Sequence, residues 1–379
     1  MSIIIFIIIL LVLVLVHEFG HFFVAKRFGI RVDEFGFGFP PKLFSFKKGE
    51  TEYSFNLLPL GGFVKIFGES LNEADFVEVG FLEKNANSQQ DFSRSLVSKP
   101  KWQQALVLFA GIFANFLLAW FLFSFGFMSG FPTSVGNESA GYQLQNVNLV
   151  IVSVLAKSPA ENAGLKIGDK IINIKSDNNF TTNISPETIK SFMAESKGRE
   201  IDIGYIRGEN TEIKLAQITP ALNIPKDNQN FSIGISMDQI GIAKLPFFSA
   251  LLEGLHLVWL TAKNTVVGLY GLLEEALSGR GSLAAITGPV GIVSIVGDAY
   301  QFGFVYLLSF AALISINLAI INLIPFPALD GGRLFFLLIE KIKGSRLSPK
   351  IANTLNIIGF YLLILLMFII TYHDVVKLF

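Results

Sequence analysis

Residues 3–21 read IIIFIIILLVLVLVHEFGH, and this stretch decides the class of the fold. All residues from Ile3 to Val16 are aliphatic or aromatic, and with their neighbours they reach the length of about 20 that a membrane-spanning helix needs. His17, Glu18 and His21 add three ionisable side chains to the same helix. Because a charged group inside a bilayer costs about 2.5 kcal/mol or more, we expect these three side chains to have a functional role there.

The composition of the whole chain agrees with a membrane protein. Of its 379 residues, 51% are hydrophobic and 16% are charged, and the mean hydropathy is +0.55. Soluble domains carry about 25% charged residues. The 30 basic residues balance the 30 acidic ones, so no net charge attracts nucleic acid, and we expect no nucleic-acid partner. Cysteine is absent, so any metal site must use His, Asp, Glu or backbone ligands.

The chain holds four segments that are apolar enough to cross a bilayer as helices. The first covers residues 2–25 and lacks the basic start and the Ala-x-Ala site of a cleaved signal peptide. The other three are residues 104–128, 304–324 and 351–372, none of which contains a charged side chain. We therefore predict a polytopic α-helical membrane protein with four transmembrane helices.

Basic residues beside these segments predict their orientation, because Lys and Arg in short flanking loops stay on the cytoplasmic side. They follow the first segment, precede the second and follow the third: Lys26, Arg27, Arg31, Arg94, Lys99, Lys101, Arg333, Lys341, Lys343, Arg346 and Lys350. We therefore expect both termini, and the residues from about 130 to 300, to lie outside the cytoplasm.

Residues 140–220 have the pattern of a small α+β domain. Alternating apolar residues predict strands at Asn148–Val154, Lys170–Ile174, Glu200–Arg207 and Thr211–Ile218. Ser185 followed by Pro186 predicts the start of a helix. This order of elements, with the run from Ser158-Pro159-Ala160 to Gly168-Asp169, resembles a PDZ domain, which would bind peptide termini beside a sheet edge. An unrelated small α+β domain is the alternative.

Three further segments have patterns of their own. Residues 34–67 alternate around Phe35–Phe39 and Tyr53–Leu58, which predicts a β-hairpin region. Residues 247–273 are apolar but interrupted by charged side chains, which favours an amphipathic helix at the membrane surface over a fifth span. Residues 283–297 are uncharged but too short to cross, and we expect a helix or re-entrant segment there.

The spacing of His17 and His21 indicates metal chemistry. On a helix, residues four apart share one face, so both imidazoles can bind one metal ion with Glu18 beside them as a general base. Catalytic zinc usually takes a third protein ligand. The pairs Glu253 with His256 and His373 with Asp374 have suitable spacings, but both fall at the opposite membrane face.

Topology favours Asp330 as the third ligand. His17 and His21 lie about 22 Å along the first helix at 1.5 Å per residue, towards its cytoplasmic end. The third span ends at Ile324, and Pro325 and Pro327 break the helix on the same side. Asp330 therefore lies at about the same depth as the histidines.

Four motifs make the chain similar to the site-2 protease family, the intramembrane zinc metalloproteases. It resembles most closely the bacterial PDZ-containing members that regulate sigma-E. The motifs, in the family's order, are His17-Glu18-Phe19-Gly20-His21, Pro59–Lys65 followed by Gly68-Glu69, Gly111 with Asn115, and Asn317 through Asn322-Leu323 to Leu329-Asp330-Gly331. Two features differ from the family: there is room for one PDZ-like domain rather than two, and Ile112 stands where the family has Pro.

This resemblance implies a zinc metalloendopeptidase that cleaves within or beside transmembrane segments of other proteins. One Zn²⁺ would be held by His17, His21 and Asp330, with Glu18 as the catalytic base. The residues expected to bind substrate are Asn317, Pro325, Pro327, Asn115, Gly36 and Gly38. A hydrogen bond between helices is the alternative for Asn317, and a structural role is the alternative for Asn115. A helical substrate must unwind first, because its backbone hydrogen bonds are internal, and an edge strand of the β-hairpin region would then pair with it.

The same resemblance implies partners and a location. The partners would be transmembrane proteins or remnant signal peptides, the lipid bilayer, and peptide termini at the PDZ-like domain. The location would be the bacterial inner membrane, with the active site near the cytoplasmic side. A zinc-dependent sensor or metal carrier, and a scaffold without chemistry, are the alternative functions.

The predicted organisation follows from these segments. In order it comprises a first span at 1–28, a cytoplasmic β region at 29–101, a second span at 102–129, a PDZ-like domain at 140–220, a linker with an amphipathic helix and a re-entrant segment at 221–301, a third span at 302–332, a cytoplasmic loop at 333–350, and a fourth span at 351–379.

Overall fold

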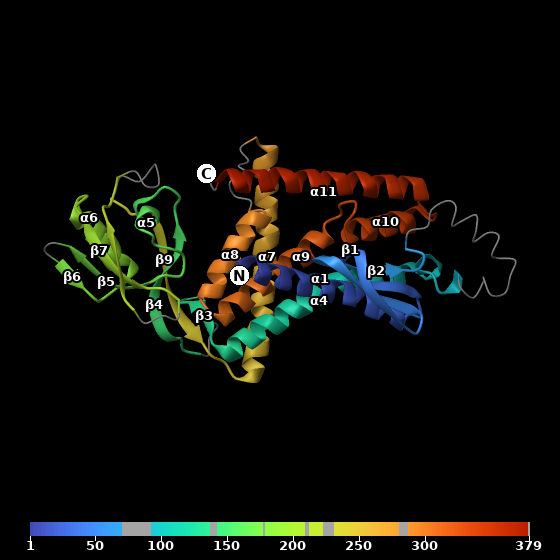
Figure 1. Ribbon diagram of the computed structural model, residues 1–379, viewed down its shortest axis with the longest axis horizontal. Helices are drawn as coiled ribbons and strands as arrows, with labels where there is room; N and C mark the ends of the chain where they lie inside the picture. Colours follow the sequence, from blue (N-terminus) through green and yellow to red (C-terminus); the bar gives the residue numbers. More distant parts are fainter. Residues whose placement is uncertain are drawn as a thin grey trace. The chain divides into compact units, whose positions relative to one another are not determined.

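The structure is a computed structural model that describes most of the chain (Figure 1). The described residues are 1–69, 92–136, 142–176, 179–208, 212–222, 231–279 and 287–377. They form two compact units. The first unit comprises Met1–Leu122, Leu255–Val296 and Ala311–Phe379, and the second comprises Phe123–Gly254 and Gly297–Phe310.

Four helices are long and apolar enough to cross a membrane, by length and composition, among the described residues. They are α1 (Ser2–Arg27), α4 (Lys101–Ser129), α9 (Phe304–Leu323) and α11 (Pro349–Lys377). These helices match the four predicted segments. α1 and α11 leave most of their apolar side chains uncovered by protein, as expected for surfaces that face lipid.

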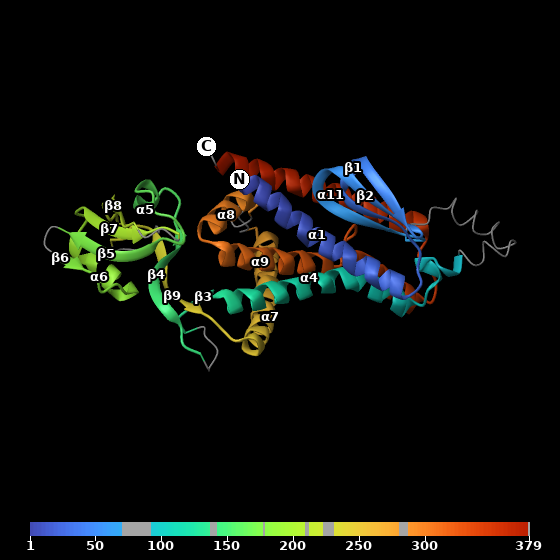
Figure 2. The same cartoon turned by 60° about the horizontal axis from the view of Figure 1, so that its bottom comes forward.

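The first unit also contains two helices that are not among these four, α7 and α10. Residues 255–277 of α7 (Phe247–Leu277) run crosswise to α1 and α11 in both views (Figures 1 and 2). α10 (Asp330–Lys343) occupies most of the segment 333–350 that was predicted to be a loop. That prediction was wrong because the basic residues there were used only as topology signals, although apolar residues between them recur at helical spacing.

The predicted β-hairpin region is present as β1 (Val32–Lys48) and β2 (Thr51–Ile66). Residues 32–37 of β1 pair with residues 62–66 on one side and with residues 52–55 on the other. Residues 42–48 pair with residues 51–56. Among the described residues, no strand pairs with the outer side of 62–66, so this segment is an edge of the sheet.

That edge lies against α1. A Cβ atom added at Gly62 would stand 3.2 Å from a methyl carbon of Leu15 and 3.8 Å from the Cγ atom of Glu18. α1 itself approaches α4 so closely that a Cβ atom at Gly20 would overlap the backbone of Ala110. Glycine at both positions therefore allows the sheet and α4 to pack onto the half of α1 that carries the HExxH sequence.

The second unit is built around an antiparallel sheet with two short helices. The strands are β3 (Phe131–Ser134), β4 (Gln145–Val154), β5 (Lys170–Ser176), β6 (Asn179–Thr181), β7 (Ile201–Ile206), β8 (Lys214–Ile218) and β9 (Ile235–Ala243), in the order β3-β9-β4-β5-β7-β8 with β6 beside β5. The helices are α5 (Pro159–Asn162) and α6 (Pro186–Ser196), and Ser158 and Ser185 cap them as N-terminal acceptors. A buried core of Ile151, Ile174, Ile189 and Ile203 holds the layers together.

The sheet extends past the predicted domain end at residue 220. β9 pairs with β4 from Gln145 opposite Ile242 to Val154 opposite Ile235, and β3 pairs with the second half of β9. β9 was missed because the polar stretch before it, at residues 223–230, suggested a linker, and this stretch lies outside the described residues. Two other predicted segments begin outside the described residues: the strand predicted from Thr211, and the helix or re-entrant segment predicted from residue 283. The described part of the second segment contains α8 (Pro289–Gln301).

Candidate metal centre

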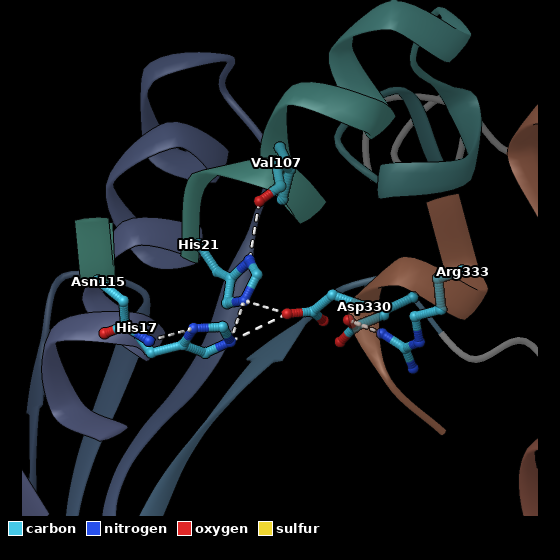
Figure 3. A network of polar contacts seen from close by, with 7 residues as sticks. His17, His21, Val107, Asn115, Asp330 and Arg333 are labelled. Atoms are coloured by element: carbon cyan, nitrogen blue, oxygen red, sulfur yellow. Dashed lines mark hydrogen bonds and ion pairs between the residues drawn. The ribbon is translucent and has the colours of Figure 1, made fainter. Parts of the chain in front are cut away.

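Three ligand-type side chains meet at one point in the first unit (Figure 3). The Nε2 atoms of His17 and His21 are 3.1 Å apart. Asp330 Oδ2 lies 2.9 Å from His17 Nε2 and 3.3 Å from His21 Nε2. Both histidines are buried, at 7% and 5% exposure, and Asp330 is half-buried. Among the described residues, this is the one group of at least three such side chains that could hold a metal ion.

The arrangement fits a zinc ion. Tetrahedral zinc with bonds of about 2.0–2.2 Å separates neighbouring ligand atoms by about 3.3 Å. The three donor atoms form a triangle with edges of 2.9, 3.1 and 3.3 Å, close to that size. Two imidazoles and one carboxylate also form one of the donor sets of catalytic zinc sites, in which the fourth position stays open. His17, His21 and Asp330 could therefore hold the ion.

Asp330 reaches the histidines because the chain turns sharply after α9. Asp330 is the first residue of α10, and a Cβ atom at Gly331 would overlap the carbonyl oxygen of Leu323. A Cβ atom at Gly332 would overlap the carbonyl oxygen of Phe326 in the same way. Only glycine fits at these two positions, so Gly331 and Gly332 allow the start of α10 to pack directly against the backbone at the end of α9.

Two ion pairs anchor α10 at this place. Arg333, one turn after Asp330, pairs with Glu69 just after the end of β2. Lys101, the first residue of α4, pairs with Glu340. Figure 3 shows Arg333 on the same helix as Asp330. These contacts tie α10 both to the exit of the sheet and to the start of α4.

α4 supplies contacts on the far side of both imidazoles. The carbonyl oxygen of Val107 accepts a hydrogen bond of 2.8 Å from His21 Nδ1, and the side-chain amide of Asn115 lies 3.2 Å from His17 Nδ1. Between them, a Cβ atom at Gly111 would overlap the His21 imidazole. Val107, Gly111 and Asn115 are each four residues apart and so share one face of α4.

Glu18 lies on the other side of α1, towards the sheet edge. Its Cγ atom would lie 3.8 Å from a Cβ atom added at Gly62, which belongs to the edge segment 62–66. The side chain is half-buried, directly after His17 and three residues before His21 in the sequence. A carboxylate in this position can take a proton from a molecule held between the cluster and the edge.

Comparison with known proteins identifies the family. Residues 5–366 match the family described as Peptidase family M50. The chain belongs to this family, the site-2 proteases. A Clostridium perfringens relative is 34% identical over 366 residues, which cover 96% of this chain and 95% of the relative. Zinc metalloproteases named RasP from Shouchella clausii and Geobacillus kaustophilus are 32% and 31% identical, over 99% and 100% of this chain and 98% of each relative.

This M50 protease is therefore an intramembrane zinc metalloendopeptidase, as its motifs predicted. Its family and its apolar helices make it a bacterial membrane protein. The matches cover nearly the full length of the chain and of these relatives, so they extend over both the helices and the second unit.

Three of the residues predicted to bind substrate lie on α9 or follow it. The Asn317 side chain is half-buried, and its Oδ1 atom accepts a hydrogen bond of 2.9 Å from Thr265 of α7. Pro325 and Pro327 lie in the turn to α10, where the N–H of Ala328 donates to Asn356 of α11 over 3.2 Å. Asn356, which sequence reasoning missed, thus helps to hold this turn.

The other three predicted substrate contacts have different surroundings. Gly36 and Gly38 are buried, and residues 32–37 of β1 are paired on both sides, unlike the free edge at 62–66. A Cβ atom at Gly36 would overlap the Phe63 ring, and Gly38 has a φ of +76°. The fold therefore requires glycine at both positions. Asn115 is 0% exposed and contacts His17. None of these three residues therefore lies at the free edge, where a substrate strand would pair.

Proposed function

We propose that this M50 protease holds its Zn²⁺ through His17, His21 and Asp330 and uses Glu18 as the general base of peptide-bond hydrolysis. The observation that carries the proposal is the triangle of donor atoms, which two helices bring together from residues 313 positions apart. When bound, the ion supplies Lewis-acid chemistry and makes water a nucleophile near neutral pH.

The residues of the chain then have distinct parts in the reaction. Glu18 accepts the proton of the attacking water and passes it to the nitrogen of the leaving amine. Asp330 completes the ligand set from α10, while His17 and His21 present their Nε2 atoms from α1. The burial of both histidines limits the access of bulk water to the ligands.

The edge segment 62–66 is the proposed place where an unwound substrate binds. A substrate segment added there as a further strand would run next to Glu18, whose Cγ atom would lie 3.8 Å from a Cβ atom added at Gly62 in that segment. Asn317, Pro325 and Pro327 are proposed to contact the substrate from the end of α9. The proposed substrates are transmembrane proteins or remnant signal peptides.

The second unit is proposed to be a PDZ-like domain that binds peptide termini. β3 pairs only with Ile240–Ala243 of β9, so among the described residues the first half of β9 has one unpaired side. α6 packs near the same strand. A free strand edge beside a helix is the arrangement that such domains use for extended peptides.

The proposed topology has four spans, both termini outside the cytoplasm and the metal centre near the cytoplasmic side. The basic residues at the ends of α1, α4 and α10 support it. The crosswise course of α7 supports a helix that lies along the membrane surface instead of a fifth span (Figure 1).

The test of the catalytic proposal is the Glu18→Gln variant, purified and compared with the wild type. We expect it to keep its zinc, measured by mass spectrometry, and to lose cleavage of a transmembrane model substrate by about 10²-fold or more. Asp330→Ala should lose the zinc itself. Full cleavage by Glu18→Gln would rule out Glu18 as the general base, and full zinc content in Asp330→Ala would rule out Asp330 as a ligand.

A further inference from the structure

Asn115 is a fully buried polar side chain next to the candidate metal centre. It is 0% exposed, and its Nδ2 atom lies 3.2 Å from His17 Nδ1. The other atom of the same amide, Oδ1, is buried and has no hydrogen-bond partner among the described residues. A rotation of the Asn115 amide would therefore bring its unpartnered Oδ1 atom next to Nδ1 of His17, a proposed zinc ligand.

The needs of His17 as a ligand decide which amide atom faces it. A histidine that binds metal through Nε2 must carry its proton on Nδ1, and this N–H requires an acceptor. Oxygen and nitrogen of a side-chain amide exchange places by a rotation of about 180°, and the two orientations have nearly the same shape. Rotation of Asn115 places Oδ1 where the Nδ1–H of His17 can donate to it.

The partner of His21 shows the same arrangement. Its Nδ1 donates to the carbonyl oxygen of Val107, an atom that can only accept, so its Nε2 atom is left free for metal. Asn115 stands two helical turns further along the same face of α4 and opposite the other histidine (Figure 3). One face of α4 thus serves the outer nitrogens of both imidazoles.

The position of Asn115 is itself fixed from the opposite side. The hydroxyl of Ser315, on α9, donates a hydrogen bond of 2.8 Å to the backbone carbonyl of Asn115. Both residues are buried. The backbone of Asn115 is therefore held between α1 and α9, and its amide has little freedom except rotation in place.

We propose that Asn115 is a positioning residue for the metal centre: its amide oxygen accepts the Nδ1–H of His17 and so fixes the tautomer that offers Nε2 to zinc. This role replaces the substrate contact predicted from the sequence, because a side chain without exposed surface cannot touch a substrate. The proposal rests on His17 being a zinc ligand, as proposed above.

The test measures zinc affinity by competition with a chelator, for detergent-solubilised full-length protein. Asn115→Leu keeps the approximate volume and removes the acceptor, and we expect it to weaken zinc binding by 10–100-fold. Asn115→Asp keeps an acceptor but cannot donate, and we expect it to bind zinc within a few-fold of the wild type. If an amide N–H donor were what His17 needs, Asn115→Asp would behave like Asn115→Leu, and the proposal would be overturned.

A matched control separates this effect from general damage to α4. Gln104→Leu makes the same change at another buried amide of α4, which donates to the carbonyl oxygen of Lys99 over 2.7 Å. We expect it to lower the thermal stability of the metal-free protein without weakening zinc binding. If Asn115→Leu binds zinc no more weakly than Gln104→Leu, the proposal fails; should the buried carboxylate of Asn115→Asp prevent folding, this comparison alone decides.

The His17→Ala variant distinguishes failure of this inference from failure of the proposed function. Loss of zinc in His17→Ala together with wild-type affinity in Asn115→Leu would overturn the role of Asn115 alone. Full zinc affinity in His17→Ala would overturn the ligand set, and the role of Asn115 with it.

Discussion

Gly111 is the residue of α4 at which an added side chain would overlap the imidazole of His21. We expect Gly111→Ala to displace that imidazole, because the added methyl group would overlap it. Zinc affinity should fall by about tenfold or more, which corresponds to about 1.4 kcal/mol. Chelator competition on the purified variant measures this.

The control for Gly111→Ala is the same change in a helix with open space. Gly271 lies in α7, and a Cβ atom there would meet nothing within 4 Å. Gly271→Ala should leave zinc affinity unchanged and stabilise the helix by up to about 1 kcal/mol. Equal zinc affinities in the two variants would show that the overlap at His21 is relieved at no cost.

The sequence carried strong signals for some residues of the centre and none for others. His17, Glu18 and His21 were evident because ionisable groups stand out within an apolar helix, and the depth of the helix ends indicated Asp330. The carbonyl of Val107 could not be predicted, since every residue has a carbonyl and its use depends on the packing of α4. Gly111 and Asn115 did give a signal: a small and a polar residue four apart in an uncharged helix.

At the scale of elements, the Arg333–Glu69 ion pair joins α10 to the exit of β2. Both side chains are partly exposed, so we expect the pair to contribute about 1 kcal/mol or less to stability. Arg333→Glu should destabilise the start of α10 and lower the zinc content. The double variant Arg333→Glu with Glu69→Arg should recover most of that loss. A double variant as impaired as the single one would show that the charges themselves do not connect the two elements.

Glu50, in the turn between β1 and β2, ties the hairpin region to the C-terminal end of α1. Burial raises its pKa, but ion pairs with Lys26 and Arg94 lower the pKa more, so it lies below the ordinary value of 4.5. A group with a lowered folded-state pKa stabilises the fold above the unfolded pKa, and this contribution disappears as the pH falls through the folded pKa. Glu50→Gln should therefore lower the unfolding temperature at pH 7 and have little effect well below pH 4.5. A difference that persists at the lowest pH would show that the ion pairs are not its cause.

Elements with a strong period were predicted well, and elements defined by distant partners were not. β4, β5, α6 and β7 followed from alternation and from the Ser185 cap. β9 was missed because a strand next to a polar stretch is recognised only through its partner β4, which lies far back in the sequence. In the hairpin region, alternation predicted strands but could not show that residues 62–66, and not Gly36 and Gly38, form the free edge.

At the scale of the whole molecule, the proposed topology predicts a sided labelling pattern. The chain has no native cysteine, so single cysteines report position directly. In intact spheroplasts, Ser176→Cys in β5 should react with a membrane-impermeant maleimide, and Lys343→Cys at the end of α10 should react only after the membrane is opened. The reverse pattern would invert the topology and place the metal centre at the opposite face.

The ligand set also sets a limit on when the protein becomes active during its own synthesis. His17 and Asp330 are 313 positions apart, so the two proposed zinc ligands on α1 emerge from the ribosome long before the third. A nascent chain that has inserted α1 and α4 therefore carries an incomplete site, whatever the supply of zinc. With this proposed ligand set, newly made enzyme cannot cut neighbouring helices until Asp330 has been translated, so the order of synthesis keeps the nascent chain inactive.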